Sequence, residues 1–127
     1  MVYATTYIKD IMKIIAGSLK GALIPTVKTK SYRPSTGKFK EALFSILTSM
    51  ESEENSIIID KIVLDLFSGT GSLAFEAISR GAKKATLIDI DQKHLDCAKS
   101  FATKHNILDQ ISFLRMDASN LGYTKYK

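Results

Sequence analysis

The sequence predicts an α/β domain built around a parallel β-sheet. Three apolar segments of strand length, at residues 62–67, 85–90 and 111–114, alternate with two helical segments. This alternation is typical of parallel strands joined by right-handed crossovers. A bend with two glycines, at 69–71, directly follows the first of these strands. The 127 residues suit one domain, and an apolar content of 45% is enough for a hydrophobic core.

The amino-terminal part predicts a β-hairpin. Residues 1–11 have no clear periodicity and are expected to form an extension. Residues 12–18 and 22–27 have the composition of two short strands, with Lys20 at the turn between them.

A helix that ends near Met50 is expected to follow the hairpin. Ser35 or Thr36 can cap its amino terminus. Phe44 is expected to belong to the core. Helical spacing predicts an apolar face made of Phe39, Ala42, Leu43, Ile46, Leu47 and Met50.

The two later helices are predicted from their periodicity and end signals. One runs from about Ser72 to Arg80, with Gly81 as the residue that ends it. Between them, residues 85–90 are apolar almost throughout, as expected of a strand buried on both faces. The second helix spans 92–105. Its inward residues are predicted to be Leu95, Ala98, Phe101 and Ala102.

The net charge of +5 is unevenly distributed along the chain. Residues 1–40 carry eight basic residues and one acidic residue, a net charge of +7. Residues 41–127 carry ten basic and twelve acidic residues, a net charge of −2. A basic amino-terminal third favours a polyanionic partner such as a nucleic acid. The alternative is that these side chains only solvate a surface.

Other features of the composition exclude several classes of protein. A single cysteine, Cys97, excludes an internal disulfide and fits a reducing compartment. No apolar run approaches the length of a membrane span, and Lys9 and Asp10 interrupt any signal-peptide core. A cytoplasmic location is therefore expected. His94 and His105 are too far apart for a metal site and are expected at the surface or at helix ends.

The glycine bend and three aspartates form the main candidate site. Gly69 and Gly71 allow the backbone to come close to a ligand, and the following helix directs free N–H groups toward it. Asp65, Asp89 and Asp117 lie near the carboxyl ends of successive predicted strands, so they are expected to converge on one crevice. Asp89 follows Gly69 by 20 residues and can accept from both hydroxyls of a ribose. Asp117 can accept from an adenine amino group, and Asp65 from an ammonium group.

This bend has two other interpretations. Gly69 to Ala74 also matches the G-x-G-x-x-A fingerprint of dinucleotide-binding proteins. The charge of Asp65 would repel a pyrophosphate, and about sixty residues precede the strand, so S-adenosylmethionine is the favoured cofactor. In the second interpretation the glycines only form a tight turn, which Asp65 caps.

Several segments, in order, resemble one known family. They are MKIIAGSLKG at 12–21, RPS at 33–35, KEALFSIL at 40–47, the segment 63–76 and SRGA at 79–82. Together they resemble the bacterial methyltransferases that modify guanine N2 in small-subunit (16S) ribosomal RNA. The similarity extends from Met12 to about Asp117. It implies a Rossmann-like, S-adenosylmethionine-dependent methyltransferase fold that stops after about the third core strand.

The resemblance implies a role for individual residues. Asp65, Gly69 and Gly71 would hold the methionine part of S-adenosylmethionine, Asp89 its ribose, and Asp117 with the Ala118 N–H its adenine. The full set of cofactor-binding residues is Asp65, Ser68, Gly69, Thr70, Gly71, Asp89, Ile90, Asp117 and Ala118. The residues expected to contact RNA are Lys13, Lys20, Lys28 and Arg33.

The resemblance also divides the chain. Residues 1–11 are the extension, and 12–127 form a partial methyltransferase domain. Within it, residues 12–55 form the basic hairpin plus helix, and 56–127 form the cofactor-binding βαβαβ half. The expected partner is small-subunit ribosomal RNA or the assembled small subunit, with no membrane and no metal.

The catalytic segment of the family is absent from this sequence. That segment is an Asn/Asp-Pro-Pro-aromatic motif, whereas the prolines here are Pro25 and Pro34. No catalytic residue is therefore predicted, and the chain alone is expected to be inactive. Two alternatives stay open: a methyltransferase for another substrate, and a non-catalytic module that binds S-adenosylmethionine or RNA. An unpaired apolar sheet edge is also expected to favour self-association.

Overall fold

The computed structural model describes residues 12–26 and 37–120. The predicted extension at 1–11, the two helix-capping residues and the basic residues Lys28 and Arg33 lie outside these ranges. None of the helices in the described ranges has the length and apolar character that a membrane crossing requires.

The core is a three-stranded parallel sheet with the order β3-β4-β5. The strands are β3 (Ile62–Asp65), β4 (Lys84–Asp89) and β5 (Ile111–Arg115). The parallel arrangement and the approximate positions of all three strands are those the sequence predicts. Because Asp65 pairs in register with Leu87, and Asp89 with Arg115, the carboxyl ends of the strands meet at one edge of the sheet.

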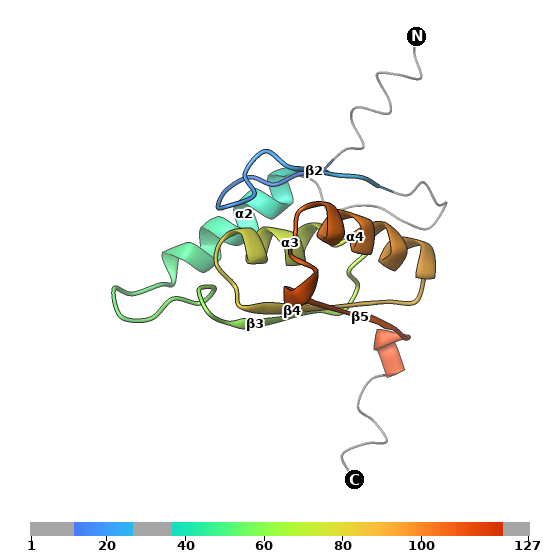
Figure 1. Cartoon of the computed structure of the whole chain (residues 1–127). Helices are drawn as coiled ribbons and strands as arrows, with labels where there is room; N and C mark the ends of the chain where they lie inside the picture. Colours follow the sequence, from blue (N-terminus) through green and yellow to red (C-terminus); the bar gives the residue numbers. More distant parts are fainter. Residues whose placement is uncertain (1–11, 27–36, 121–127) are drawn as a thin grey trace.

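Two helices, α3 (Ser72–Ser79) and α4 (Gln92–Lys104), lie on the same face of this sheet (Figure 1). The four residues predicted to face inward from α4 are all buried. Phe101 of α4 packs against Phe75 of α3 with ring centroids 4.5 Å apart. Two short 3₁₀ segments, η1 (Leu108–Gln110) and η2 (Ala118–Asn120), flank β5.

The predicted hairpin is present, with shorter strands than expected. Strands β1 (Met12–Lys13) and β2 (Leu23–Ile24) pair antiparallel, and Met12 pairs with Ile24. Lys20 lies in the turn, as predicted. The hairpin lies on the side of α3 that faces away from the sheet (Figure 1).

Helix α2 (Gly37–Ser49) buries a different face from the one predicted. Lys40 and Phe44 are its buried residues, and Leu43 and Leu47 are half-buried. The remaining members of the predicted face are exposed, namely Phe39, Ala42, Ile46 and Met50. The inward face is centred on Lys40 and Phe44 because Lys40 pairs with Glu76 of α3, and Phe44 contacts the guanidinium group of Arg80, the residue that follows α3. An apolar pattern does not reveal such partners.

The opposite face of the sheet carries exposed apolar side chains. Ile62 is 75% exposed, Leu64 is 59% exposed and Leu114 is 47% exposed. Within residues 12–26 and 37–120, no α-helix lies on this face (Figure 1). Strand β3 is also an edge strand of the described sheet. These apolar residues form the surface on which the self-association prediction depends.

Candidate functional site

The loop between β3 and α3 has a tightly defined backbone. The Ser68 N–H donates to the Ile88 carbonyl at 3.0 Å, and the Gly71 N–H donates to the Ser68 carbonyl at 2.8 Å. Gly71 has a φ of 95°, and a Cβ atom there would lie 2.6 Å from the Phe75 ring and 2.8 Å from Leu87. A side chain at position 71 is therefore excluded by both conformation and space. We refer to residues 68–71 as the glycine loop.

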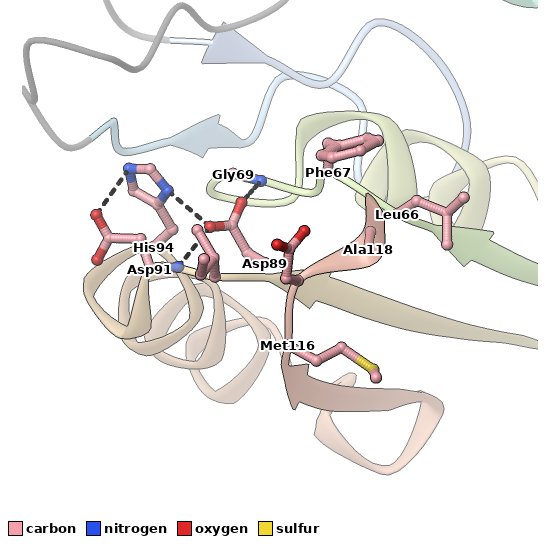
Figure 2. Close-up of a pocket in the computed structure, with 10 residues that line it drawn as sticks. Leu66, Phe67, Gly69, Asp89, Asp91, His94, Met116 and Ala118 are labelled. Atoms are coloured by element: carbon pink, nitrogen blue, oxygen red, sulfur yellow. Dashed lines mark hydrogen bonds and ion pairs between the residues drawn. The ribbon is translucent and has the colours of Figure 1, made fainter. Parts of the chain in front are cut away.

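Asp89 holds the glycine loop from the end of β4. Its Oδ2 accepts a hydrogen bond from the Gly69 N–H at 2.8 Å, and its Oδ1 accepts one from the Asp91 N–H at 2.8 Å. The His94 Nδ1 also lies 3.3 Å from Oδ1 (Figure 2). Each carboxylate oxygen has two lone pairs, so Oδ2 can accept a further hydrogen bond from a ligand hydroxyl.

An open pocket of about 340 Å³ lies beyond the carboxyl ends of β4 and β5 (Figure 2). This volume is within the usual range for small-molecule sites. Five of the predicted cofactor residues line it, which are Gly69, Asp89, Ile90, Asp117 and Ala118. Five further lining residues were not predicted, which are Leu66, Phe67, Asp91, His94 and Met116. The predicted residues Asp65, Ser68, Thr70 and Gly71 do not line this pocket.

Asp65 lies in a neighbouring apolar groove rather than in the pocket. Its carboxylate accepts hydrogen bonds from the backbone of Phe67 and Ala74, because its side chain points toward α3. Burial raises the pKa of Asp65 to about 6; these backbone bonds oppose the rise, and the nearby charge of Asp89 adds to it. Among the described residues, its buried Oδ2 has no hydrogen-bond partner. The structure thus brings Asp89 and Asp117 to one pocket and leaves Asp65 beside it.

Asp117 and Ala118 form the far side of the pocket. The Asp117 side chain is exposed and accepts hydrogen bonds from the Ser119 N–H at 2.9 Å and from the Ser119 hydroxyl at 2.5 Å. These bonds, that of the hydroxyl above all, hold the pKa of Asp117 below its usual value. Ala118 begins η2 directly after this turn.

His94 is a site residue that was not predicted from the sequence. It lies in the first turn of α4, but it is only 5% exposed, and its ring lies between Asp89 and Asp91 (Figure 2). Spacings of four and seven residues place His94 on the same inward stripe as Ala98 and Phe101, and this periodicity is the signal that could have found it. Asp91 is the N-cap of α4, where its side chain accepts from the Lys93 N–H at 2.9 Å.

Two of the four predicted RNA-binding residues can be placed. Lys13 and Lys20 are exposed on the hairpin, whereas Lys28 and Arg33 lie outside the described residues. Lys40, which contributes to the basic charge of the amino-terminal third, is fully buried and pairs with Glu76. Within the described ranges, no cluster of three or more metal-binding side chains is present.

Residues 12–126 match the pattern of a protein family described as Conserved hypothetical protein 95. The chain belongs to this family. Its curated relatives include an uncharacterized methylase of Rickettsia prowazekii, 52% identical over 114 residues, which cover 89% of this chain and 48% of the relative. They also include the ribosomal RNA small subunit methyltransferase D of Haemophilus influenzae, 32% identical over 82% of this chain and 54% of the relative. The chain therefore spans about half the length of the curated relatives it matches.

Solved structures show the same fold. A methyltransferase structure from Escherichia coli superposes with a TM-score of 0.69 at 28% identity, covering 85% of this chain and 54% of that one. An RNA methyltransferase from Salinibacter ruber, solved with S-adenosyl-L-homocysteine, shares the fold with a TM-score of 0.56 at 19% identity, covering 69% of this chain and 52% of that one. The predicted fold, a Rossmann-like methyltransferase fold with a parallel core, is confirmed.

Proposed function

We propose that this chain is the S-adenosylmethionine-binding part of a methyltransferase that acts on guanine N2 of small-subunit (16S) ribosomal RNA in the cytoplasm. The observation that carries the proposal is the hydrogen bond from the Gly69 N–H to the Asp89 carboxylate, at the carboxyl ends of parallel strands. A glycine loop and an acidic residue held together at this place suit a ligand with an adenosine group. Family relatives named ribosomal RNA small subunit methyltransferase D support the RNA substrate.

The residues present fit the parts of S-adenosylmethionine. The buried, unpartnered Oδ2 of Asp65 suits the ammonium group of the methionine part, since a buried carboxylate gains most from a cation. Asp89 Oδ2 has remaining capacity for a ribose hydroxyl. Asp117 and the Ala118 N–H lie across the pocket, where an adenine amino group and a ring nitrogen would find an acceptor and a donor. When bound, the cofactor supplies an activated methyl group.

The hairpin suits contact with RNA phosphates. Lys13 and Lys20 are exposed, and the hairpin backbone is attached to α3 by hydrogen bonds. Positive side chains on a fixed backbone supply affinity that does not depend on base sequence. Guanine specificity would have to come from residues that contact the base itself.

Methyl transfer needs groups that this sequence does not contain. The exocyclic amine of guanine is a weak nucleophile because its lone pair is delocalised into the ring. The family motif Asn/Asp-Pro-Pro-aromatic would orient this amine and stabilise the charge that develops on it. Since the prolines of this sequence are Pro25 and Pro34, we expect no turnover by the 127 residues alone.

A second candidate function is a non-catalytic module that binds S-adenosylmethionine or RNA. The pocket and the exposed lysines described above are compatible with it, because binding alone does not need the catalytic motif. A radiolabelled-methyl assay on undermodified small subunits separates the two candidates when the chain is tested alone and within any longer product of its gene. Turnover by the longer product supports the enzyme, and its absence there supports the module.

Calorimetry with S-adenosylhomocysteine and with NAD tests the cofactor proposal. We expect S-adenosylhomocysteine to bind more tightly, because the carboxylates of Asp65 and Asp89 disfavour a pyrophosphate near the glycine loop. Tighter binding of NAD would contradict the proposal and support the dinucleotide interpretation of the loop.

A further inference from the structure

Lys40 and Glu76 form an ion pair in the interior of the protein. Both side chains are fully buried, and Nζ of Lys40 lies 3.2 Å from Oε1 of Glu76. An isolated buried charge is very costly, so both groups require complete sets of partners. Their partners come from elements far apart in the sequence.

The ammonium group of Lys40 contacts three acceptors on two different elements. It donates to the carbonyl of Lys13 in β1 at 2.7 Å and to the hydroxyl of Ser72 at the start of α3 at 3.2 Å. Glu76, in the middle of α3, is the third. An ammonium group has three N–H donors, so these contacts use all of them.

Glu76 completes the connection to the hairpin. Its Oε1 accepts from the Ile15 N–H at 2.9 Å, and its Oε2 accepts from the Ala16 N–H at 3.1 Å and from Arg80 Nε at 2.9 Å. Burial raises the pKa of Glu76, but these hydrogen bonds and Lys40 outweigh that effect and hold it below its usual value. The carboxylate is therefore charged when it binds the hairpin backbone.

The hairpin and α3 also meet at a second point. The Ser79 hydroxyl donates to the Ala16 carbonyl at 2.6 Å and accepts from the Leu19 N–H at 2.9 Å. At Gly17 a Cβ atom would lie 1.9 Å from the Ser79 carbonyl oxygen. These contacts hold the hairpin without Lys40. Attachment of the hairpin to α3 therefore does not depend on Lys40. The bond from Lys40 to Ser72 instead acts on the first residue of α3.

Ser72 directly follows Gly71, the last residue of the glycine loop. The Gly71 carbonyl accepts the first hydrogen bond of α3, from the Phe75 N–H at 2.8 Å. A group that holds Ser72 therefore also constrains the end of the loop. We propose that Lys40 is a positioning residue that fixes the start of α3, and with it the glycine loop, to the hairpin. This inference rests on the proposed cofactor role of the loop.

Amide hydrogen exchange on the ligand-free 127-residue chain tests the positioning role. The variants are Lys40→Met, Ser72→Ala and both together. Lys38→Met is the matched control, because it removes the same charge from an exposed position of α2. In Lys40→Met, Glu76 keeps Arg80 and two backbone donors. Ser72→Ala removes only the bond to the loop end and leaves the ion pair intact, so it serves if Lys40→Met folds poorly.

We expect the amides of Gly71 and Phe75 to exchange at least about tenfold faster in both single variants, with no further increase in the double variant. The amide of Ala98, in the middle of α4, and all amides of Lys38→Met should keep their wild-type rates. If the exchange rates of Gly71 and Phe75 increase by the same factor as that of Ala98, Lys40 acts on global stability and the proposal is wrong.

Calorimetry with S-adenosylhomocysteine on the same variants adds a readout of function. A loss of about tenfold in affinity for Lys40→Met and Ser72→Ala, with none for Lys38→Met, supports the proposal. Unchanged affinities in a wild type that binds would overturn it. A wild type that does not bind contradicts the proposed function instead, and the exchange rates then still decide the role of Lys40.

Discussion

The carboxylate of Asp89 and the backbone N–H of Gly69 are joined by a hydrogen bond of 2.8 Å, which attaches the end of β4 to the loop that follows β3. From the sequence, Asp89 is predicted to bind only the ribose of the cofactor. In the structure the same carboxylate also holds the loop that would surround the cofactor. Loss of Asp89 should therefore affect the shape of the site as well as its contacts with a ligand.

Asp89→Ala should weaken binding of S-adenosylhomocysteine by about 1–3 kcal/mol, the scale for leaving buried hydrogen-bonding groups without partners. Asp91→Ala is the matched control, since Asp91 caps α4 and its backbone N–H bond to Asp89 survives the change. Calorimetry on both variants measures the difference. Equal losses at the two positions would show that the ligand does not depend on Asp89 in particular.

Asp65→Asn should stabilise the protein at high pH. The pKa of Asp65 is about 6 in the folded state against an ordinary value of 3.8, so between these values the folded state binds more protons than the unfolded state. The contribution of this group to stability therefore falls as the pH rises through this window, and its full cost is present above about pH 6.

Urea denaturation at pH 4 and pH 8 checks this effect. The Asn variant should be more stable than wild type by about 1–3 kcal/mol at pH 8, with a much smaller difference at pH 4. The same variant should bind S-adenosylhomocysteine more weakly, because it lacks the charge that suits an ammonium group. An Asn variant that is less stable than wild type at pH 8 and unchanged in affinity would contradict both the buried charge of Asp65 and its role in binding the ammonium group.

Gly71→Ala should destabilise the protein more than Gly21→Ala. Both glycines have a positive φ, 95° and 89°, so the conformational penalty is similar. A Cβ at Gly71 would collide with Phe75 and Leu87, whereas nothing lies within 4 Å of a Cβ at Gly21. Thermal or urea denaturation should show an extra loss of about 1–3 kcal/mol at Gly71, the usual cost of overpacking. Similar losses would mean that the loop can move to accept a side chain.

Charge reversal at Lys13 and Lys20 should reduce the salt dependence of RNA binding. Each phosphate contact that is lost should lower the slope of log affinity against log salt by roughly one. Lys99→Glu with Lys104→Glu, on the exposed side of α4, is the control of equal charge. Filter binding of a small-subunit RNA fragment at several salt concentrations measures both. A slope that changes only in the α4 variant would place the RNA on that helix.

Ile62→Lys with Leu64→Lys should reduce self-association of the chain. Both side chains lie on the exposed strand β3, which is an edge of the described sheet, and such edges favour pairing with other chains. Ile46→Lys, at an exposed position of α2, is the control. Light scattering should show smaller particles for the β3 variant alone. A monomeric wild type would contradict the expectation directly.

Periodicity and composition predicted α4 and β4 well because the burial of these two elements follows from their local pattern. Leu95, Ala98 and Phe101 recur at helical spacing and are buried. The apolar residues of β4, which are Ala85, Leu87 and Ile88, are buried as well, as the composition of this segment predicts. The position of the glycine loop followed equally directly, since two glycines directly after an apolar strand are typical of a bend at which the backbone needs a positive φ.

The sequence by itself determined the order of the elements, the parallel sheet, the glycine loop and the family, because each depends on residues close together in the chain. Tertiary structure alone decided which charged groups are buried. Lys40 is held by a carbonyl 27 residues away, and Glu76 by an N–H 61 residues away. The charge pattern predicts an exposed Lys40, and only the contacts among β1, α2 and α3 make its burial favourable. The direction of Asp65 was decided in the same way, because the N–H groups that receive its carboxylate belong to the loop and to α3 as they pack against β3.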